Sequence, residues 1–290
     1  MPEVLSRKTR YKLQYAVIWA FLRCGRILPF PMRVKLGGAL LGFAIAHLKT
    51  PRGRIESNLQ RIFPEMSAEE REEIVNAVGK NFGKSFIEVL NNDSSIKYPE
   101  LRHVSGPGLL ALREAQASGR GAILVSGHFG QWDAARLFLK AEGTDVGAVY
   151  RPSNNTYFDR LFVPQIENAG RPAFSSGRRG TLEMVRHIRA GGVVAILLDQ
   201  RFHDGEKLDF MGQPAMTSTA AASMALKYDL PMIPVYCTRR GNSLHIDVEF
   251  EEPIPHSTPT EMTQLANDSL TRRVQETPGQ WYWLHNRWST

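Results

Sequence analysis

The chain has 290 residues, of which 42% are hydrophobic and 22% charged, close to the usage of ordinary globular proteins. This length and composition exclude a disordered or fibrous chain, and they allow one large α/β domain with or without a helical extension. The formal net charge of +7 favours an anionic partner: nucleic acid, an anionic lipid headgroup or an acidic carrier protein, although a soluble enzyme with a basic surface also fits.

Residues 1–95 are expected to form a helical, membrane-associating N-terminal region. Two apolar runs in it, Tyr15–Leu22 and Gly37–Leu48, are shorter than the roughly 20 residues that a spanning helix needs. Basic residues rather than a small-residue cleavage site follow the first run, so it is not interpreted as a cleaved signal. The two runs either lie in the membrane interface, with basic neighbours near anionic headgroups, or are ordinary core helices.

The segment that begins at Ser67 has Glu at the third position after it, the pattern of a capping box, and predicts a helix through about Leu90. Residues 96–290 are expected to form an α/β core, with the chain one continuous domain. Short aliphatic strands are predicted at Ala122–Ser126, Val146–Tyr150, Val193–Leu198, Met232–Thr238 and Leu244–Phe250. Helices are predicted at Trp132–Glu142, Tyr157–Asn168, Gly180–Ala190, Thr217–Tyr228 and about Thr260–Glu276. This alternation predicts an α/β fold, a mostly parallel central sheet flanked by helices, with a site at the strand ends.

One strand-to-helix junction carries the strongest chemical pattern. The strand Ala122–Ser126 runs into Gly127 and His128, and a helix is expected to start near Gln131. Asp133 would lie about one turn into that helix, where it could fold back and bind Nδ1 of His128 while Nε2 faces the substrate. By itself, His followed by an acid at this spacing is a weak pattern that occurs by chance in many proteins.

Acyl transfer to an alcohol requires such a pair, because a hydroxyl is a poor nucleophile until a base takes its proton. The sequence contains no Gly-x-Ser-x-Gly elbow, and neither cysteine has a neighbouring base. Direct attack by an acceptor hydroxyl on a thioester donor is therefore the simpler mechanism. Cys24 and Cys237 follow no metal or redox spacing and are interpreted as inert thiols in a reducing compartment.

The stretch from Ser126 to Asp133 resembles the His-x4-acid motif of the glycerolipid acyltransferase superfamily, and specifically of the late acyltransferases of lipid A biosynthesis and their relatives that acylate phosphatidylinositol mannosides. Further blocks resemble this family in the same order, so that the resemblance spans about residues 54–288. They are Asn58–Glu65, Tyr150-Arg151-Pro152 with Asn155 and Asp159, Leu198-Asp199-Gln200, Phe210–Ala215, and the terminal Gln280–Trp288.

The resemblance implies an inner-membrane enzyme, peripheral or monotopic on the cytoplasmic face, that moves an acyl chain from acyl carrier protein or coenzyme A to a hydroxyl of an anionic glycolipid such as a lipid A precursor. His128 would be the general base and Asp133 its partner. Arg151 would bind an anionic headgroup or a carrier phosphate, and Asp199 would serve a charge relay or bind a substrate hydroxyl; alternatively, the first forms a surface ion pair and the second caps a turn. The other expected substrate contacts are Trp132, Tyr150, Gln200 and Arg201. No metal and no cofactor are expected.

Two parts of the sequence remain open. The family's additional Arg-x-Arg pair is missing from its expected place, and Arg171, or Arg178 with Arg179, are the candidates to replace it. His285 and its tryptophan neighbours form either a rim at headgroup level or a cover over the core. The loop Arg201–Gln213 is a candidate lid.

Three alternatives compete with this interpretation. The acceptor is another lysolipid or a phosphatidylinositol mannoside, or the enzyme is a lipid hydrolase in which His128 activates water. The third alternative is a non-catalytic protein that binds anionic membranes or nucleic acid. Nucleic acid is not the expected partner, because the sequence has no recognition motif and its basic residues are scattered.

Overall fold

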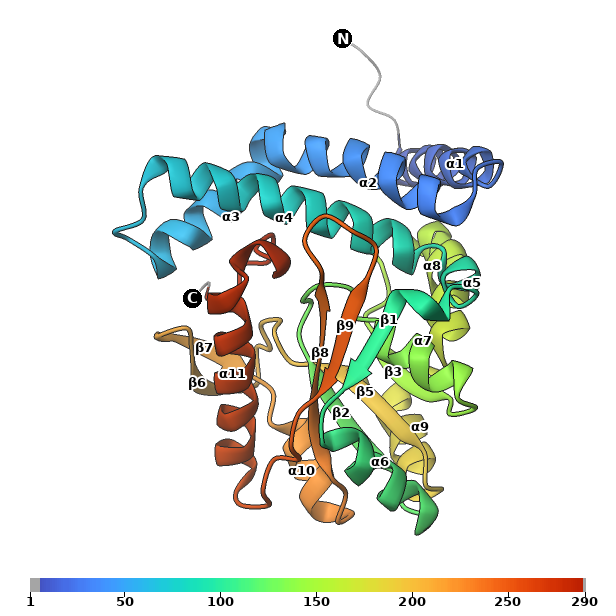
Figure 1. Ribbon diagram of the computed structural model, residues 1–290, viewed down its shortest axis with the longest axis vertical. Coiled ribbons are helices and arrows are strands. Elements are labelled where there is room, and N and C mark those ends of the chain that lie inside the picture. Colours follow the sequence, from blue (N-terminus) through green and yellow to red (C-terminus); the bar gives the residue numbers. More distant parts are fainter. Residues whose placement is uncertain (1–5, 289–290) are drawn as a thin grey trace.

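The protein is described from a computed structural model, which covers residues 6–288. Four helices cross one end of the molecule and lie over the α/β core (Figure 1). They are α1 (Arg7–Gly25), α2 (Phe30–His47), α3 (Lys49–Ile62) and α4 (Ala68–Val89). The N-terminal region is therefore helical, as the sequence predicts.

Helix α4 begins with the predicted capping box. The Ser67 side chain accepts a hydrogen bond from the backbone N–H of Glu70, and the Glu70 carboxylate accepts one from the backbone N–H of Ser67 at 2.9 Å. Helix α2 packs against α4 through facing glycines, since a Cβ on Gly83 would lie 2.3 Å from the carbonyl oxygen of Gly38. Any larger residue at this contact would push the two helices apart.

A seven-stranded sheet forms the core, in the order β1-β9-β8-β2-β5-β3-β4. The strands are β1 (Arg102–Ser105), β2 (Ala122–Ser126), β3 (Val146–Tyr150), β4 (Ala173–Ser175), β5 (Val193–Leu197), β8 (Met232–Arg239) and β9 (Ile246–Phe250). All neighbouring pairs are parallel except β8 and β9. The predicted mostly parallel sheet is confirmed.

Helices cover both faces of this sheet, which explains why its central strand β2 is apolar up to its last residue, Ser126. In β2, Leu124 packs with residues of α6 (Gly108–Ala117) and α7 (Ala134–Ala141) on one face. On the other face, Ile123 and Val125 pack with α9 (Arg178–Arg189), α10 (Ala220–Lys227) and α11 (Pro259–Glu276). The remaining helices are α8 (Thr156–Ala169), the short α5 (Asn92–Ser95), and the 3-10 turns η1 (Pro99–Leu101) and η2 (Pro278–Gln280).

The structure corrects the prediction in three places. Strands β1 and β4 are not among the predicted strands, because four and three residues are too few for a recognisable alternation of apolar and polar side chains. The candidate lid Arg201–Gln213 contributes to a hairpin that was not predicted, formed by the antiparallel strands β6 (Glu206–Phe210) and β7 (Gln213–Thr217), whose Phe210 is buried. Helix α7 begins at Ala134, so Asp133 precedes it and does not lie one turn inside it.

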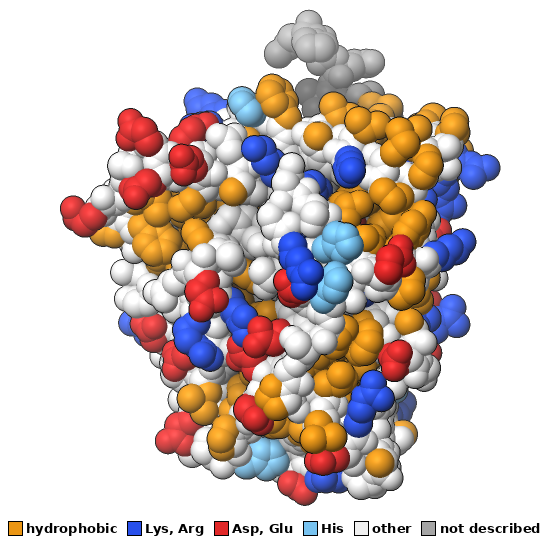
Figure 2. Space-filling model, in the orientation of Figure 1, with side chains coloured by type: hydrophobic (Ala, Val, Ile, Leu, Met, Phe, Trp, Pro, Cys, Tyr) orange, Lys and Arg blue, Asp and Glu red, His pale blue; other side chains and the backbone are white. Residues whose placement is uncertain are grey.

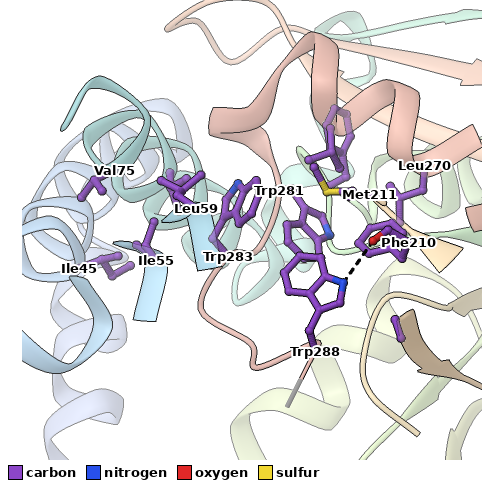
Figure 3. Close-up of a cluster of buried hydrophobic side chains, with 14 of the residues drawn as sticks. Ile45, Ile55, Leu59, Val75, Phe210, Met211, Leu270, Trp281, Trp283 and Trp288 are labelled. Atoms are coloured by element: carbon purple, nitrogen blue, oxygen red, sulfur yellow. Dashed lines mark hydrogen bonds between the residues drawn. The ribbon is translucent and has the colours of Figure 1, made fainter. Parts of the chain in front are cut away.

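The tryptophans near the C-terminus belong to the core. Trp281, Trp283 and Trp288 are all at most 5% exposed, and they pack together with Phe210 and with Leu59 of α3 (Figure 3). The indole N–H of Trp288 donates to the carbonyl oxygen of Phe210 at 3.2 Å. The interpretation as a cover over the core is confirmed, and the interpretation as a rim of tryptophans at headgroup level is wrong.

Candidate active site

Three loops that carry predicted site residues meet at one edge of the sheet. Strands β2, β5 and β3 are parallel neighbours, so their carboxyl ends lie side by side. His128 follows β2, Asp199 follows β5 and Arg151 follows β3. In an open parallel sheet this edge is the usual place for a ligand site.

His128 and Asp199 form a hydrogen-bonded pair. Nδ1 of His128 lies 2.8 Å from Oδ1 of Asp199, and the other carboxylate oxygen accepts the backbone N–H of His128 at 2.7 Å. That second oxygen also accepts the indole N–H of Trp281 at 2.9 Å. The Asp199 side chain is 2% exposed and that of His128 is 21% exposed. His128 is therefore the more exposed partner, and its Nε2 lies on the side of the ring opposite to Asp199.

The environment keeps Asp199 ionised. Burial alone would raise the pKa of its carboxyl, but His128 and the hydrogen bond from Trp281 outweigh burial and hold this pKa below its ordinary value. A carboxylate anchored in this way selects the imidazole tautomer with the proton on Nδ1, which leaves Nε2 as a base.

The expected contact between His128 and Asp133 is wrong. The Asp133 carboxylate is buried, where it accepts hydrogen bonds from Arg136 at 2.8 Å and from the Asn92 amide at 2.9 Å. Asp133 precedes α7, and each of its carboxylate oxygens is held by one of these partners and not by the imidazole. Asp199 takes the place that the sequence spacing suggested for Asp133.

Two glycines shape the loop that carries His128. A Cβ on Gly127 would lie 3.2 Å from Cγ of Asp199, so glycine permits the close approach of that carboxyl group. Gly130 has a φ of +54°, and a Cβ there would lie 1.9 Å from the carbonyl oxygen of Cys237. The Gly130 carbonyl oxygen also accepts a hydrogen bond from the Ser85 hydroxyl of α4 at 2.7 Å, which ties the loop to the N-terminal helices.

Aromatic side chains border the His128 ring. The ring centroid of Trp132 lies 5.4 Å and that of Tyr282 lies 5.7 Å from the imidazole centroid, and Phe82 of α4 contacts both aromatics. Burial raises the pKa of the Tyr282 hydroxyl, while the positive charge of Arg54 acts in the opposite direction. This wall offers an apolar surface next to the base, as a fatty acyl chain would require.

The other predicted site residues lie in the two neighbouring loops. Tyr150 is partly buried at the end of β3, and Arg151 after it is exposed. The Gln200 side chain is exposed, whereas the backbone N–H of Arg201 donates to Nε2 of His285 at 2.9 Å. The structure thus brings the predicted residues of three loops to one edge, but it assigns Arg201 a backbone contact that supports the turn after Asp199.

Sequence reasoning did not assign the parts played by His285, Arg287 and Tyr282. Burial lowers the pKa of His285, which leaves its Nε2 free of a proton to accept from Arg201. Arg287 donates to the Gln200 carbonyl oxygen at 3.3 Å, so both residues brace the turn that holds Asp199. The terminal block was visible in the sequence, but its contact with this turn crosses more than 80 residues of chain.

No group of three or more His, Cys, Asp or Glu side chains within residues 6–288 is arranged to hold a metal ion. Both cysteines are free, with Cys24 exposed and Cys237 buried. Burial raises the pKa of the Cys237 thiol to about 12, which keeps it protonated and unreactive.

Comparisons with known proteins agree with the sequence blocks. The chain is 27% identical to a lipid A biosynthesis acyltransferase of Haemophilus influenzae, over 94% of this chain and 87% of that protein. It is 25% identical to the lipid A biosynthesis lauroyltransferase of Escherichia coli, over 96% and 90% of the two chains. A phosphatidylinositol mannoside acyltransferase of Mycobacterium tuberculosis is 25% identical over 62% of this chain and 58% of its own length.

The family pattern covers nearly the whole molecule, including the N-terminal helices and the C-terminal block. The profile described as bacterial lipid A biosynthesis acyltransferase matches residues 3–290. The chain therefore belongs to the family of bacterial lipid A biosynthesis acyltransferases.

Proposed function

We propose that the protein is an O-acyltransferase that moves a fatty acyl chain from acyl carrier protein to a hydroxyl group of a lipid A precursor or a related glycolipid. The hydrogen-bonded pair of His128 and Asp199 carries this proposal. A partly exposed imidazole whose Nδ1 is bound by a buried carboxylate is the arrangement that activates a hydroxyl in acyl transfer.

In the proposed mechanism, Nε2 of His128 takes the proton of the acceptor hydroxyl while its oxygen attacks the thioester carbonyl carbon. The tetrahedral intermediate then collapses, the carbon–sulfur bond breaks, and the imidazolium returns the proton to the departing thiolate. Asp199 stabilises the positive charge on the imidazole between these two steps and stays ionised throughout, in line with its lowered pKa. No covalent acyl-enzyme is formed.

The acceptor proposal is supported by the names of the relatives and by charge. The relatives include lipid A biosynthesis acyltransferases and phosphatidylinositol mannoside acyltransferases, so a phosphatidylinositol mannoside or another lysolipid is the alternative acceptor. Arg151 is exposed beside the site, and its positive charge acts to lower the pKa of His285. The positive charge of Arg54 likewise acts to lower the pKa of Tyr282. Two guanidinium groups whose charge acts on residues at the site suit an acceptor with an anionic headgroup.

We also propose that the protein binds the cytoplasmic face of the inner membrane through α1 and α2. Along α2, Met32, Leu36, Leu40 and Phe43 recur at helical spacing and are 47–66% exposed. Apolar side chains gather over these helices at the top of the molecule (Figure 2). No helix within residues 6–288 is long and apolar enough to span a bilayer. An apolar helix face with basic residues at the start of α1 is typical of interfacial binding.

The catalytic proposal is tested with His128→Ala. We expect transfer from acyl carrier protein to a lipid A precursor to fall by at least about a hundredfold, because the general base is lost, while the thermal unfolding midpoint changes little. Mass spectrometry of the lipid product measures the transfer. Unchanged transfer by the folded variant would overturn the assignment, and release of free fatty acid alone by wild type would indicate the hydrolase alternative.

The membrane proposal is tested with Leu36→Glu/Leu40→Glu/Phe43→Glu. These side chains are already exposed, so the variant should fold but should no longer sediment with vesicles that contain anionic phospholipid. Leu110→Glu/Leu265→Glu, at 64% and 45% exposed positions of α6 and α11, is the matched control and should sediment like wild type. If the α2 variant sedimented with the vesicles as fully as the control, the assignment of the α2 face to the membrane would be contradicted.

A further inference from the structure

Helix α9 presents a basic face to solvent. It carries four exposed arginines and a single acidic residue, Glu183, whose carboxylate pairs with Arg179 at 3.0 Å. Because the Arg179 side chain is 90% exposed, that ion pair contributes little and can be exchanged for an external carboxylate. The basic residues are Arg178, Arg179, Arg186 and Arg189.

An apolar side chain lies in the middle of these charges. Leu182 is 52% exposed and lines a surface depression of about 450 Å³ together with Arg178, Arg179, Glu183 and Arg186. An exposed leucine next to three guanidinium groups combines an apolar anchor with electrostatic attraction, which is how charged protein partners are commonly held. The inward face of α9, with Met184 and Ile188, is occupied by the core, so this outward face is free for a partner.

The position of α9 relates this face to the active site. The helix follows β4 at the same edge of the sheet as His128, and the backbone N–H of Ser176, two residues before it, donates to the Tyr150 carbonyl oxygen at 2.7 Å. In the sheet, β4 is three strands away from β2, a lateral distance of about 14 Å. A partner on α9 therefore stands beside the site without covering it, and a flexible arm could reach His128 past Tyr150.

Other surfaces at this end of the molecule suit an acidic protein less well. The apolar face of α1 and α2 is the proposed membrane contact. The turn between α3 and α4 and the start of α4 are acidic, with exposed Glu65, Glu69, Glu70 and Glu73 (Figure 2), and would repel an acidic helix. The flank formed by α9 is basic and is not part of the membrane face.

We propose that the outward face of α9, formed by Arg178, Arg179, Leu182 and Arg186, is the docking surface for the acidic, helical acyl carrier protein. This inference rests on the proposed acyl transfer from a carrier thioester. Carboxylates of the carrier pair with the arginines and an apolar carrier residue covers Leu182, while the prosthetic arm extends along the sheet edge to the aromatic wall beside His128. The lipid acceptor enters from the membrane side, so the two substrates approach from different directions.

The experiment compares Arg178→Glu/Arg179→Glu/Arg186→Glu with wild type in two assays. We expect the KM for acyl carrier protein to rise roughly tenfold or more, with kcat and the rate with acyl-pantetheine unchanged, because only protein docking is lost. Equilibrium binding of the holo carrier protein, measured by fluorescence anisotropy, should weaken by the same factor and lose most of its salt dependence. Arg178→Glu and Arg179→Glu place glutamates in the first turn of α9, where they are favourable, and all three replaced side chains are exposed, so the variant is expected to fold.

Two further variants serve as controls. Replacement of the same three arginines by lysine keeps the charge and should retain most of the binding. Arg113→Glu/Arg120→Glu/Lys227→Glu reverses three exposed charges, on α6, in the segment before β2 and at the end of α10, and it should bind the carrier like wild type. Equal loss of binding in this control would show a general charge effect and overturn the proposal.

The remaining outcomes separate docking from catalysis. If the α9 variant binds the carrier normally but binds anionic vesicles less well, the face contacts the membrane and the proposal fails. If only the KM for acyl coenzyme A rises, the face holds the nucleotide phosphates and the proposal also fails. If the carrier binds through α9 but wild type transfers no acyl group, the docking surface stands and the proposed function fails.

Discussion

The loops after β2 and β5 each bring a buried carboxylate to the same edge of the sheet, yet the two carboxylates have opposite surroundings. Asp133 is paired with the guanidinium of Arg136, which is itself buried. Asp199 is paired with the imidazole of His128, which is partly exposed. The first pair is closed to substrate, and the second presents a base to it.

The contacts of Arg136 explain why the Asp133 side is structural. Besides Asp133, this guanidinium donates to the carbonyl oxygens of Val146, Ile166 and Gly170, and so ties α7 to β3 and α8. Asp133 supplies the countercharge for this group, which could not be buried alone. A carboxylate near a histidine in sequence can therefore support the fold, while a distant one acts on the histidine.

The largest expected effect is on Asp199. In Asp199→Asn, an amide facing Nδ1 would favour the tautomer with the proton on Nε2, where His128 no longer accepts a proton. We expect kcat for acyl transfer to fall by about 10²–10⁴-fold, with substrate binding measured separately and little changed. A rate close to wild type would show that the pairing with His128 is not used in catalysis.

Asp133→Asn should instead affect stability. Removing one partner of a buried ion pair costs about 3–5 kcal/mol, so the free energy of unfolding should fall by about this amount in a denaturant titration. Below its melting temperature, the variant should keep kcat within roughly tenfold of wild type. The double variant Asp133→Asn/Arg136→Met removes the uncompensated charge and should recover part of the stability. A kcat loss as large as that of Asp199→Asn would instead restore the pairing expected from sequence spacing.

The smallest effect is expected at His285, as a dependence of stability on pH. Burial lowers its pKa from the ordinary 6.5, so the unfolded chain binds a proton more readily than the folded chain. The contribution of neutral His285 to the free energy of unfolding should therefore be present in wild type above about pH 6.5 and be lost as the pH falls below this value. His285→Gln retains an acceptor for the Arg201 N–H but does not titrate, so its melting temperature should fall less between pH 7 and pH 5. Parallel melting curves for the two proteins would contradict this role.

Much of the fold was predictable because β2, β3 and β5 consist almost entirely of apolar residues bounded by turns. The capping box at Ser67 and the mainly parallel sheet followed from local pattern in the same way. By contrast, β1 and β4 are edge strands of four and three residues, held by pairing with neighbours and not by their own periodicity. The hairpin of β6 and β7 is held by the aromatic cluster around Phe210, which residues far away in the chain complete.

The sequence by itself determined the fold class, the family and the position of His128 at a strand-to-helix loop, because each depends on local spacing. Only the tertiary structure decided which carboxylate the imidazole meets. That choice follows from the pairing of β2 with β5, which places Ser126 beside Leu197 and so brings position 199 next to position 128 across 71 residues of chain. Sequence spacing measures distance along one segment, whereas the site is assembled across neighbouring strands whose order is set by burial of the whole sheet.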